Sequence, residues 1–427
     1  MNAPEKLPQL TDHGLLRFLT CGSVDDGKST LIGRLLYDTK AILVNTLHAI
    51  ERTSKKRGME AIDLSLLTDG LQAEREQGIT IDVAYRYFTT GTRKYIIADA
   101  PGHEQYTRNM VTAALTADLA VILIDARKGV LTQTRRHSYL AHLVGIPHLV
   151  VAVNKMDLVD YAQEVFDRIV ADYRDFAAQL GIEDVRFVPM SALAGDMVVE
   201  RGDRLGWYRG PTLLALLETA QASHAERTEN FRFPVQYVCR PQDSANPELH
   251  DYRGFMGRVE SGSIAVGDAV TVLPSGRASR VKDIQVLGRS LLSAFAEQSV
   301  ALLLEDEIDV SRGDMIVRTG EQPDAVRQIG AMLCWLSETP LDPRRKYLVR
   351  HTTRDSKALV AGIDFCMDVN TMERRPAEAL AMNDIAKVSL KLAQPIFPDA
   401  YARNRSTGAF IVIDESTNNT VGAGMIL

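Results

Sequence analysis

The stretch from Gly22 to Ser29 constrains the fold more than any other part of this 427-residue sequence. It has the spacing of a phosphate-binding loop: glycine, four residues, glycine, lysine and then serine or threonine. Residues 15–21 before it are mostly apolar and predict a buried strand, and leucine and isoleucine recur at helical spacing over residues 31–36. A strand, a glycine-bounded loop and a helix start form an anion site, because backbone N–H groups and the helix N-terminus present positive charge. A chance glycine turn is the alternative, and the flanking elements count against it.

The loop suggests a role for each of its last residues. Lys28 is expected to reach the β- and γ-phosphates of a nucleoside triphosphate, and the Ser29 hydroxyl to ligate Mg²⁺. The candidate nucleotide-binding residues here are Gly22, Ser23, Val24, Asp25, Asp26, Gly27, Lys28, Ser29 and Thr30.

The order of apolar runs predicts the architecture of the chain. From about residue 18 to residue 222, expected strands at 95–98, 119–124, 149–153 and 185–188 alternate with helix-period stretches at 107–116, 132–144 and 161–180. This alternation indicates an α/β domain with a mostly parallel sheet, over residues 1–222. After a polar linker, short alternating runs separated by Gly, Asp and Ser turns predict two small antiparallel β-barrels, at 231–325 and 328–427.

Three further segments carry polar residues directly after expected strands, where the ligands of such sheets bind. In the first, an acid is placed to hold Mg²⁺ through water and a glycine to offer its N–H to a γ-phosphate. That segment is Asp99, Ala100, Pro101, Gly102 and His103. The other two are Asn154, Lys155, Met156 and Asp157, and Ser191, Ala192 and Leu193.

The last two segments predict that the base is guanine. Asp157 can accept from the N1–H and the exocyclic amine of guanine, while the Asn154 amide can contact its carbonyl and N7 side. The backbone N–H groups of Ser191–Leu193 can reach the guanine oxygen. Adenine presents the opposite donor pattern at these edges and would leave a buried carboxylate unpaired. Each segment is a weak motif alone, but their order after successive strands predicts a site for GTP and GDP.

His103 is the candidate for positioning the attacking water. No glutamine stands beside Gly102, so the water-orienting role that glutamine has in other GTPases falls to this imidazole. Together with Lys28, His103 is a candidate catalytic residue.

Composition narrows the class of protein. The net charge of −6 argues against a general nucleic-acid coat, which needs clustered positive charge. The four cysteines are scattered without a Cys-x-x-Cys pair, which is typical of reduced thiols in a cytosolic chain. Neither a secretory signal nor an apolar run long enough for a membrane span occurs in the sequence. We therefore expect a soluble, cytoplasmic protein.

These motifs together resemble those of translation-factor-type GTPases. The phosphate loop, Gly78–Thr80, the 99–103 segment and the guanine segments all match, and Gly257–Gly262 with Gly267 and Asp268 resembles the first barrel of elongation factors. Within that superfamily the chain is most similar to the large, GTPase subunits of heterodimeric ATP sulfurylases, through the stretches 69–88, 103–110, 125–130 and 133–137. Elongation factor Tu is less similar, because it has histidine where Ser23 and Asp26 stand.

The resemblance implies a function that the motifs alone do not give. The family converts ATP and sulfate into adenosine 5′-phosphosulfate and pyrophosphate, driven by GTP hydrolysis on this subunit, with a small ATP-binding subunit as partner in a heterodimer or higher oligomer. The resemblance also implies that Thr80 is catalytic and ligates Mg²⁺, together with Ser29 and Asp99. The alternative for Thr80 is a strand position after a helix end capped by Gly78. The sequence has no second phosphate loop after residue 230, so no adenylylsulfate kinase activity is expected in it.

Two other functions stay open from the sequence. One is an elongation factor that delivers aminoacyl-tRNA, and the other is a regulatory GTPase that scaffolds other proteins. Binding of tRNA in a GTP-dependent manner, without an effect on sulfate adenylylation, would distinguish the first of these.

Overall fold

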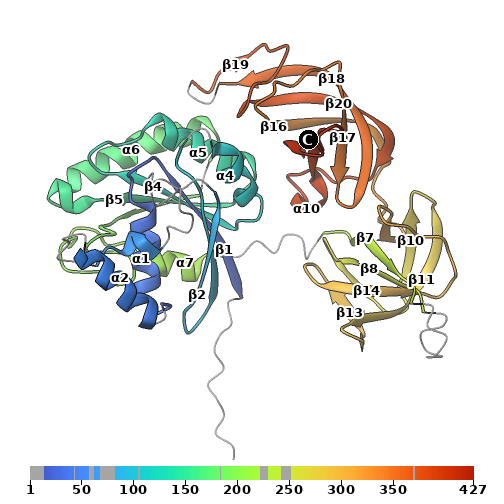
Figure 1. The fold of residues 1–427 in the computed structure, drawn as a ribbon, viewed down its shortest axis with the longest axis horizontal. Coiled ribbons are helices and arrows are strands. Elements are labelled where there is room, and N and C mark those ends of the chain that lie inside the picture. The colour runs from blue at the N-terminus through green and yellow to red at the C-terminus, as the bar shows by residue number, and fades with distance from the viewer. Residues whose placement is uncertain are drawn as a thin grey trace, which may run out of the picture. The chain divides into compact units, whose positions relative to one another are not determined.

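The computed structural model describes residues 14–42, 44–56, 62–67, 82–103, 106–182, 184–221, 229–241, 252–368 and 371–427. The chain divides into two units, residues 1–223 and 224–427 (Figure 1). Among the helices of these described residues, none combines the length and the apolar content that crossing a bilayer requires.

The first unit is built on a six-stranded sheet in the order β2-β3-β1-β4-β5-β6. The pairs from β3 to β6 are parallel, and β2 runs antiparallel to β3. The strands are β1 (Leu15–Gly22), β2 (Ala84–Thr89), β3 (Lys94–Asp99), β4 (Leu119–Asp125), β5 (His148–Asn154) and β6 (Val185–Pro189). Every residue of β4 is buried, as expected for a central parallel strand that is covered on both faces.

Helices cover both faces of this sheet. Figure 1 shows α4, α5 and α6 on one side and α1, α2 and α7 on the other. Their bounds are α1 (Lys28–Asp38), α2 (Val44–Lys56), α4 (Thr107–Ala114), α5 (Thr132–Leu143), α6 (Gln163–Gln179) and α7 (Leu213–Thr219), with the 3-10 turns η1 (Leu64–Leu67) and η3 (Met156–Val159).

The register of the sheet brings the ends of the strands to one edge. Thr20 of β1 lies opposite Asp99 at the end of β3, and Asp125 at the end of β4 lies opposite Asn154 at the end of β5. Pro189, the last residue of β6, lies opposite Val153. Residues that follow β1, β3, β5 and β6 in the sequence therefore meet at this edge, which is where such sheets bind ligands.

The second unit contains two closed antiparallel sheets of six strands, each around its own hydrophobic core. The first barrel closes because β10 pairs with both β11 and β15. Its strands are β7 (Arg232–Cys239), β8 (Gly254–Arg258), β10 (Ala269–Leu273), β11 (Arg277–Val286), β14 (Ser299–Leu304) and β15 (Met315–Arg318), with β9 (Ser263–Ala265), β12 (Arg289–Leu291) and β13 (Ser293–Phe295) beside them.

The second barrel closes through the pairing of β17 with both β18 and β21. Its strands are β16 (Val326–Trp335), β17 (Lys346–His351), β18 (Arg354–Met367), β20 (Ile385–Ile396), β21 (Ala409–Ile413) and β22 (Thr420–Ile426), with β19 (Arg374–Arg375) and the short helix α10 (Arg405–Gly408) added. The predicted fold class, an α/β domain followed by two antiparallel barrels, is confirmed. The boundaries 1–222, 231–325 and 328–427 stay predictions.

A buried ion pair joins the two barrels. Arg232 of the first barrel is 2% exposed, and its Nε and Nη2 each lie 3.0 Å from a carboxylate oxygen of Asp399 in the second. Thr407 Oγ1 donates to the same carboxylate at 2.6 Å, and Arg232 Nη1 donates to the Glu321 carbonyl at 2.7 Å. Burial favours the neutral form of Asp399, but the hydrogen bonds from Arg232 and Thr407 outweigh it and hold the pKa of Asp399 below its ordinary value.

Removal of this carboxylate is expected to destabilise the second unit. Asp399→Ala leaves a buried guanidinium unpaired, which should lower the free energy of unfolding by about 3–5 kcal/mol in denaturant unfolding of the full chain. The control is Asp355→Ala, which breaks an exposed pair with Arg350 and should cost less than about 1 kcal/mol. Because the folded pKa of Asp399 is depressed, the stabilisation should also be lost as the pH falls below about 4. Equal, small losses for both variants would contradict the assignment.

Candidate nucleotide-binding site

The phosphate loop lies between the end of β1 at Gly22 and the start of α1 at Lys28. Gly27 has a φ of 94°, a left-handed conformation that favours glycine, and its carbonyl accepts the N–H of Leu31 in the first turn of the helix. Lys28 turns back over the loop, where its Nζ lies 3.0 Å from the Gly22 carbonyl oxygen and 3.1 Å from that of Ser23. The loop therefore holds its lysine in place through its own backbone.

Asp26 places a buried carboxylate inside the loop. Its Oδ2 accepts the backbone N–H of Ser23 at 2.6 Å, and the residue is 1% exposed. Burial raises the pKa of Asp26, while the positive charge of Lys28 acts in the opposite direction. The contact closes the loop on itself, which stabilises its shape without help from a ligand.

The segment after β3 packs directly against the loop. Asp99 is buried, and the N–H of Ala100 donates to the Thr20 carbonyl on β1 at 3.1 Å. A Cβ on Gly102 would lie 2.5 Å from Lys28 Nζ and 2.7 Å from the Gly22 carbonyl oxygen, so only glycine fits there. Burial lowers the pKa of Lys28, and the charge of Asp99 is the largest influence that opposes this shift.

His103 stands apart from this buried group. Its side chain is exposed, whereas Ala100, Pro101 and Gly102 before it are buried. Its ring lies 6.1 Å from that of Tyr106, between centroids, at an angle of 60°. This position is open to water next to the segment that packs on the phosphate loop, as a water-positioning role requires.

Asn154 joins the phosphate loop to the segment after β6. Its Nδ2 donates to the Asp26 carbonyl at 2.8 Å, and its Oδ1 accepts the Ala192 N–H at 2.9 Å. The approach is close, because a Cβ on Gly27 would lie 2.5 Å from Asn154 Nδ2. Here the Asn154 amide and the Ala192 N–H bond each other, so their direct contacts to a base stay predictions.

Asp157 reaches the same segment from the 3-10 turn that follows β5. Its Oδ1 accepts from Ser191 Oγ at 2.6 Å, and its side chain is half-buried. Met156 beside it is fully buried, and its N–H donates to the Met190 carbonyl at 3.1 Å. The two segments predicted to recognise guanine are thus brought together.

Asp125 at the end of β4 was not among the predicted site residues. It is 1% exposed and forms ion pairs with Lys155 Nζ at 3.1 Å and with Arg127 Nη2 at 2.7 Å. Burial favours its neutral form, but hydrogen bonds from Arg127 and Lys155 hold the pKa of Asp125 far below its ordinary value. Lys155 also donates to the Asp25 carbonyl, so Asp125 anchors the phosphate loop indirectly. The sequence did contain a signal for Asp125, because it is the acidic residue that ends a wholly apolar run.

Two of the three predicted Mg²⁺ ligands, Ser29 and Asp99, lie among the described residues. Thr80 lies outside the described residues. Among the described residues there is no group of three His, Cys, Asp or Glu side chains that could hold a metal. Ser29 follows Lys28 directly, and Asp99 lies opposite Thr20 of β1, two residues before the loop begins. A hydroxyl and a carboxylate fit Mg²⁺, which prefers oxygen ligands and takes its remaining ones from water and phosphate.

Comparison with known proteins agrees with this geometry. The family model described as elongation factor Tu GTP binding domain matches residues 13–226, and the one described as GTP-eEF1A C-terminal domain-like matches residues 328–427. The fold and the site define a GTPase of the elongation factor Tu type.

Relatives of the full chain specify the family further. The chain is 55% identical over 423 residues to sulfate adenylyltransferase subunit 1 of Alteromonas mediterranea, and 54% identical over 423 residues to that of Saccharophagus degradans; each match covers 99% of this chain and 88% of the relative. Identity to the Psychromonas ingrahamii protein of the same name is 56% over 414 residues, covering 96% of this chain and 87% of the relative. The chain belongs to the sulfate adenylyltransferase subunit 1 family.

Substitution of Gly102 tests the packing on the phosphate loop. Gly102→Ala should weaken binding of guanine nucleotides by about tenfold or more, because the new Cβ displaces Lys28 from the loop carbonyls. The control is Gly91→Ala, where nothing lies within 4 Å of the added Cβ and wild-type affinity is expected. Fluorescence titration with GDP and GTP measures both. Wild-type affinity in Gly102→Ala would contradict the packing.

Proposed function

We propose that this chain is the GTP-hydrolysing subunit of a sulfate adenylyltransferase. In this proposal it binds GTP across the strand ends of its first unit. Hydrolysis is coupled to the formation of adenosine 5′-phosphosulfate and pyrophosphate from ATP and sulfate on a small, ATP-binding partner subunit. Support comes from the family to which the chain belongs and from the arrangement of its four loops.

The contact of Asn154 with two loops is the observation that carries the nucleotide assignment. One buried amide fixes the phosphate loop through Asp26 and the guanine segment through Ala192. A nucleotide has its phosphates at one end and its base at the other, so the two recognition elements must keep a fixed separation. The geometry supports a single ligand that contacts both.

Several other residues of the candidate site would contact the nucleotide or its metal ion. Lys28 would lie against the β- and γ-phosphates, and the carboxylate of Asp157 would accept from the N1–H and the amine of guanine. Ser29, Asp99 through water, and Thr80 would hold Mg²⁺, which when bound neutralises charge on the phosphates. Gly102, packed on Lys28, would offer its N–H to the γ-phosphate.

Hydrolysis requires a water molecule in line with the γ-phosphate. His103 is exposed, directly follows Gly102 and would orient that water. Loss of the γ-phosphate removes the partner of the Gly102 N–H and releases the segment 99–103. Such a change gives the two nucleotide states different surfaces, which a partner subunit can distinguish.

Coupling is needed because a phosphosulfate anhydride is a high-energy product relative to ATP. An unfavourable equilibrium shifts only if a second source of free energy drives states that bind the partner differently.

A cytoplasmic location is part of the proposal, and it is supported by the four free cysteines, of which Cys21, Cys334 and Cys366 are buried.

Asp157→Asn is expected to change the base preference of the site from guanine to xanthine. The amide can accept from N1–H and donate to the 2-oxo group of xanthine, but its single oxygen cannot replace the two carboxylate oxygens that accept from the N1–H and the amine of guanine, so GTP affinity should fall by about two orders of magnitude or more. The contact with Ser191 should survive, because an amide oxygen also accepts from its hydroxyl. Competition between GDP and XDP measures the exchange. Unchanged GTP affinity would contradict the role of Asp157.

The coupling itself is tested by sulfate-dependent pyrophosphate release. The full chain is combined with the small ATP-binding subunit, ATP and sulfate, with and without GTP. We expect pyrophosphate to accumulate well beyond its GTP-free level only while GTP is hydrolysed. The same yield without GTP would contradict the proposal, and GTP-dependent binding of aminoacyl-tRNA in place of it would favour a translational GTPase.

His103→Ala is the matched variant for this assay. It should slow GTP hydrolysis by about a hundredfold or more while GDP affinity is retained, because the side chain acts on water and not on the nucleotide. The GTP-dependent part of pyrophosphate release should be lost with it. A variant that hydrolyses GTP at the full rate would remove His103 from the mechanism.

A further inference from the structure

Arg34 connects the helix of the phosphate loop to the loop after β6. It lies on α1, which begins with Lys28. Its Nε donates to the Ala192 carbonyl at 3.1 Å and its Nη2 to the Leu193 carbonyl at 2.5 Å. Both acceptors lie in the segment predicted to recognise the guanine oxygen.

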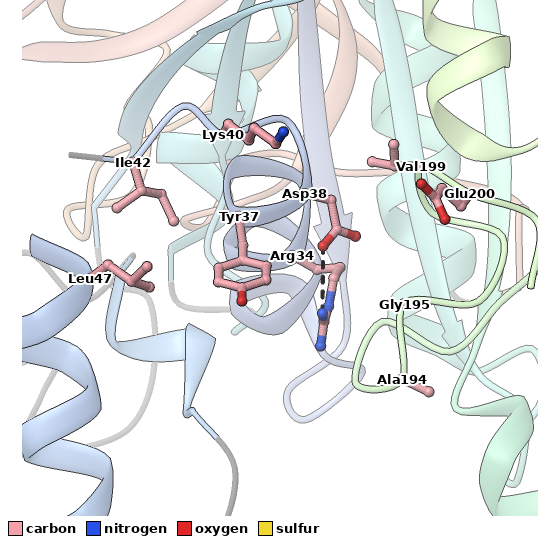
Figure 2. Close-up of a pocket in the computed structure, with 10 residues that line it drawn as sticks. All are labelled: Arg34, Tyr37, Asp38, Lys40, Ile42, Leu47, Ala194, Gly195, Val199 and Glu200. Atoms are coloured by element: carbon pink, nitrogen blue, oxygen red, sulfur yellow. Dashed lines mark ion pairs between the residues drawn. The ribbon is translucent and has the colours of Figure 1, made fainter. Parts of the chain in front are cut away.

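The rest of the guanidinium is also held. Nη1 lies 3.5 Å from Asp38 Oδ1, and the Tyr37 ring centroid is 5.7 Å from Cζ. Figure 2 shows the Arg34–Asp38 pair on α1 beside the loop that carries Ala194 and Gly195, at the wall of a cavity of about 550 Å³. The Arg34 side chain is 19% exposed, with the bond from Nε part-buried and the bond from Nη2 open to water. Only arginine presents a planar set of donors that can bind two neighbouring carbonyls at once.

The same loop is bound to the guanine-recognition residues by other atoms. Ser191 Oγ donates to Asp157, and the Ala192 N–H donates to Asn154. The turn closes through the Gly195 N–H, which donates to the Ser191 carbonyl at 2.8 Å. Arg34 adds its two bonds to these contacts, so the loop is bound both to Asn154 and Asp157 and to α1.

We infer that Arg34 is a positioning residue for recognition of the guanine oxygen, an inference that rests on the proposed function. A trans peptide is planar, so a carbonyl of Ala192 held on Arg34 turns the Leu193 N–H in the opposite direction. The Leu193 carbonyl fixes the Ala194 N–H in the same way, and this group donates to Ser191 Oγ at 3.1 Å. Arg34 thereby sets the orientation of the backbone donors, and it links them to the helix that starts at Lys28.

The readout is a ratio of affinities, which a general loss of stability would not move. GDP and IDP both carry the 6-oxygen, whereas the 5′-diphosphate of 2-aminopurine riboside lacks it. In Arg34→Ala of the full chain, GDP and IDP should each lose about tenfold in affinity, because the backbone donors are no longer held toward the 6-oxygen. Affinity for the 2-aminopurine analogue should change less than about threefold, so that its discrimination from GDP falls.

Two further variants separate the effect of the two carbonyl hydrogen bonds from the effect of the positive charge. Asp38→Asn removes the ion pair but leaves both carbonyl contacts, and its discrimination should equal that of the wild type. Arg34→Lys keeps the charge but can bond one carbonyl, so it should lie between wild type and Arg34→Ala. Thermal melting of each variant confirms that it is folded.

Three results would decide against this role. Unchanged GDP affinity in Arg34→Ala would overturn it. An equal loss for GDP and the 2-aminopurine analogue would also overturn it, because the effect would then be on the whole site. Wild-type affinity in Arg34→Lys would show that simultaneous bonds to the two carbonyls are not required. Failure of the wild-type chain to bind GDP would instead contradict the proposed function.

Discussion

The buried amide of Asn154 is the contact on which the candidate site depends. It donates to the phosphate loop and accepts from the loop after β6, so the position of each loop is defined by the other. In a buried environment such bonds are stronger than in water, and loss of either one would leave a polar group without a partner. The absence of a side chain on Gly27 makes the contact possible, because a Cβ there would lie 2.5 Å from Asn154 Nδ2. Arg34 and Asp125 then hold the same two loops from outside.

Much of the first unit could be predicted from the sequence, for a clear physical reason. Parallel strands covered on both faces must be apolar along their length, so 119–124 and 149–153 predicted β4 and β5 to within one residue at each end. Polar residues directly after such runs then mark the edge of the sheet where ligands bind. The strand β2 gave no comparable signal, because it lies at the sheet edge and Tyr85 and Tyr87 are exposed on it.

Contacts between distant residues could not be predicted in this way. The pair of Arg232 and Asp399 spans 167 positions, and Arg34 lies 158 positions from Ala192. Neither arginine stands in a motif, and both are conspicuous only when their partners are known. Asp125 could have been noticed as an acid at the end of a strand, but its pairing with Lys155 depends on the register of β4 and β5. The segments of the site were therefore predictable, while the side chains that hold them together were not.

Amide hydrogen exchange of the full chain, with GDP and with ADP, tests most directly whether one guanine nucleotide spans these loops. The account predicts that GDP slows exchange together at 22–29 and 191–193, while ADP at the same concentration leaves both segments unchanged. Protection confined to residues 22–29, or equal protection by ADP, would contradict it.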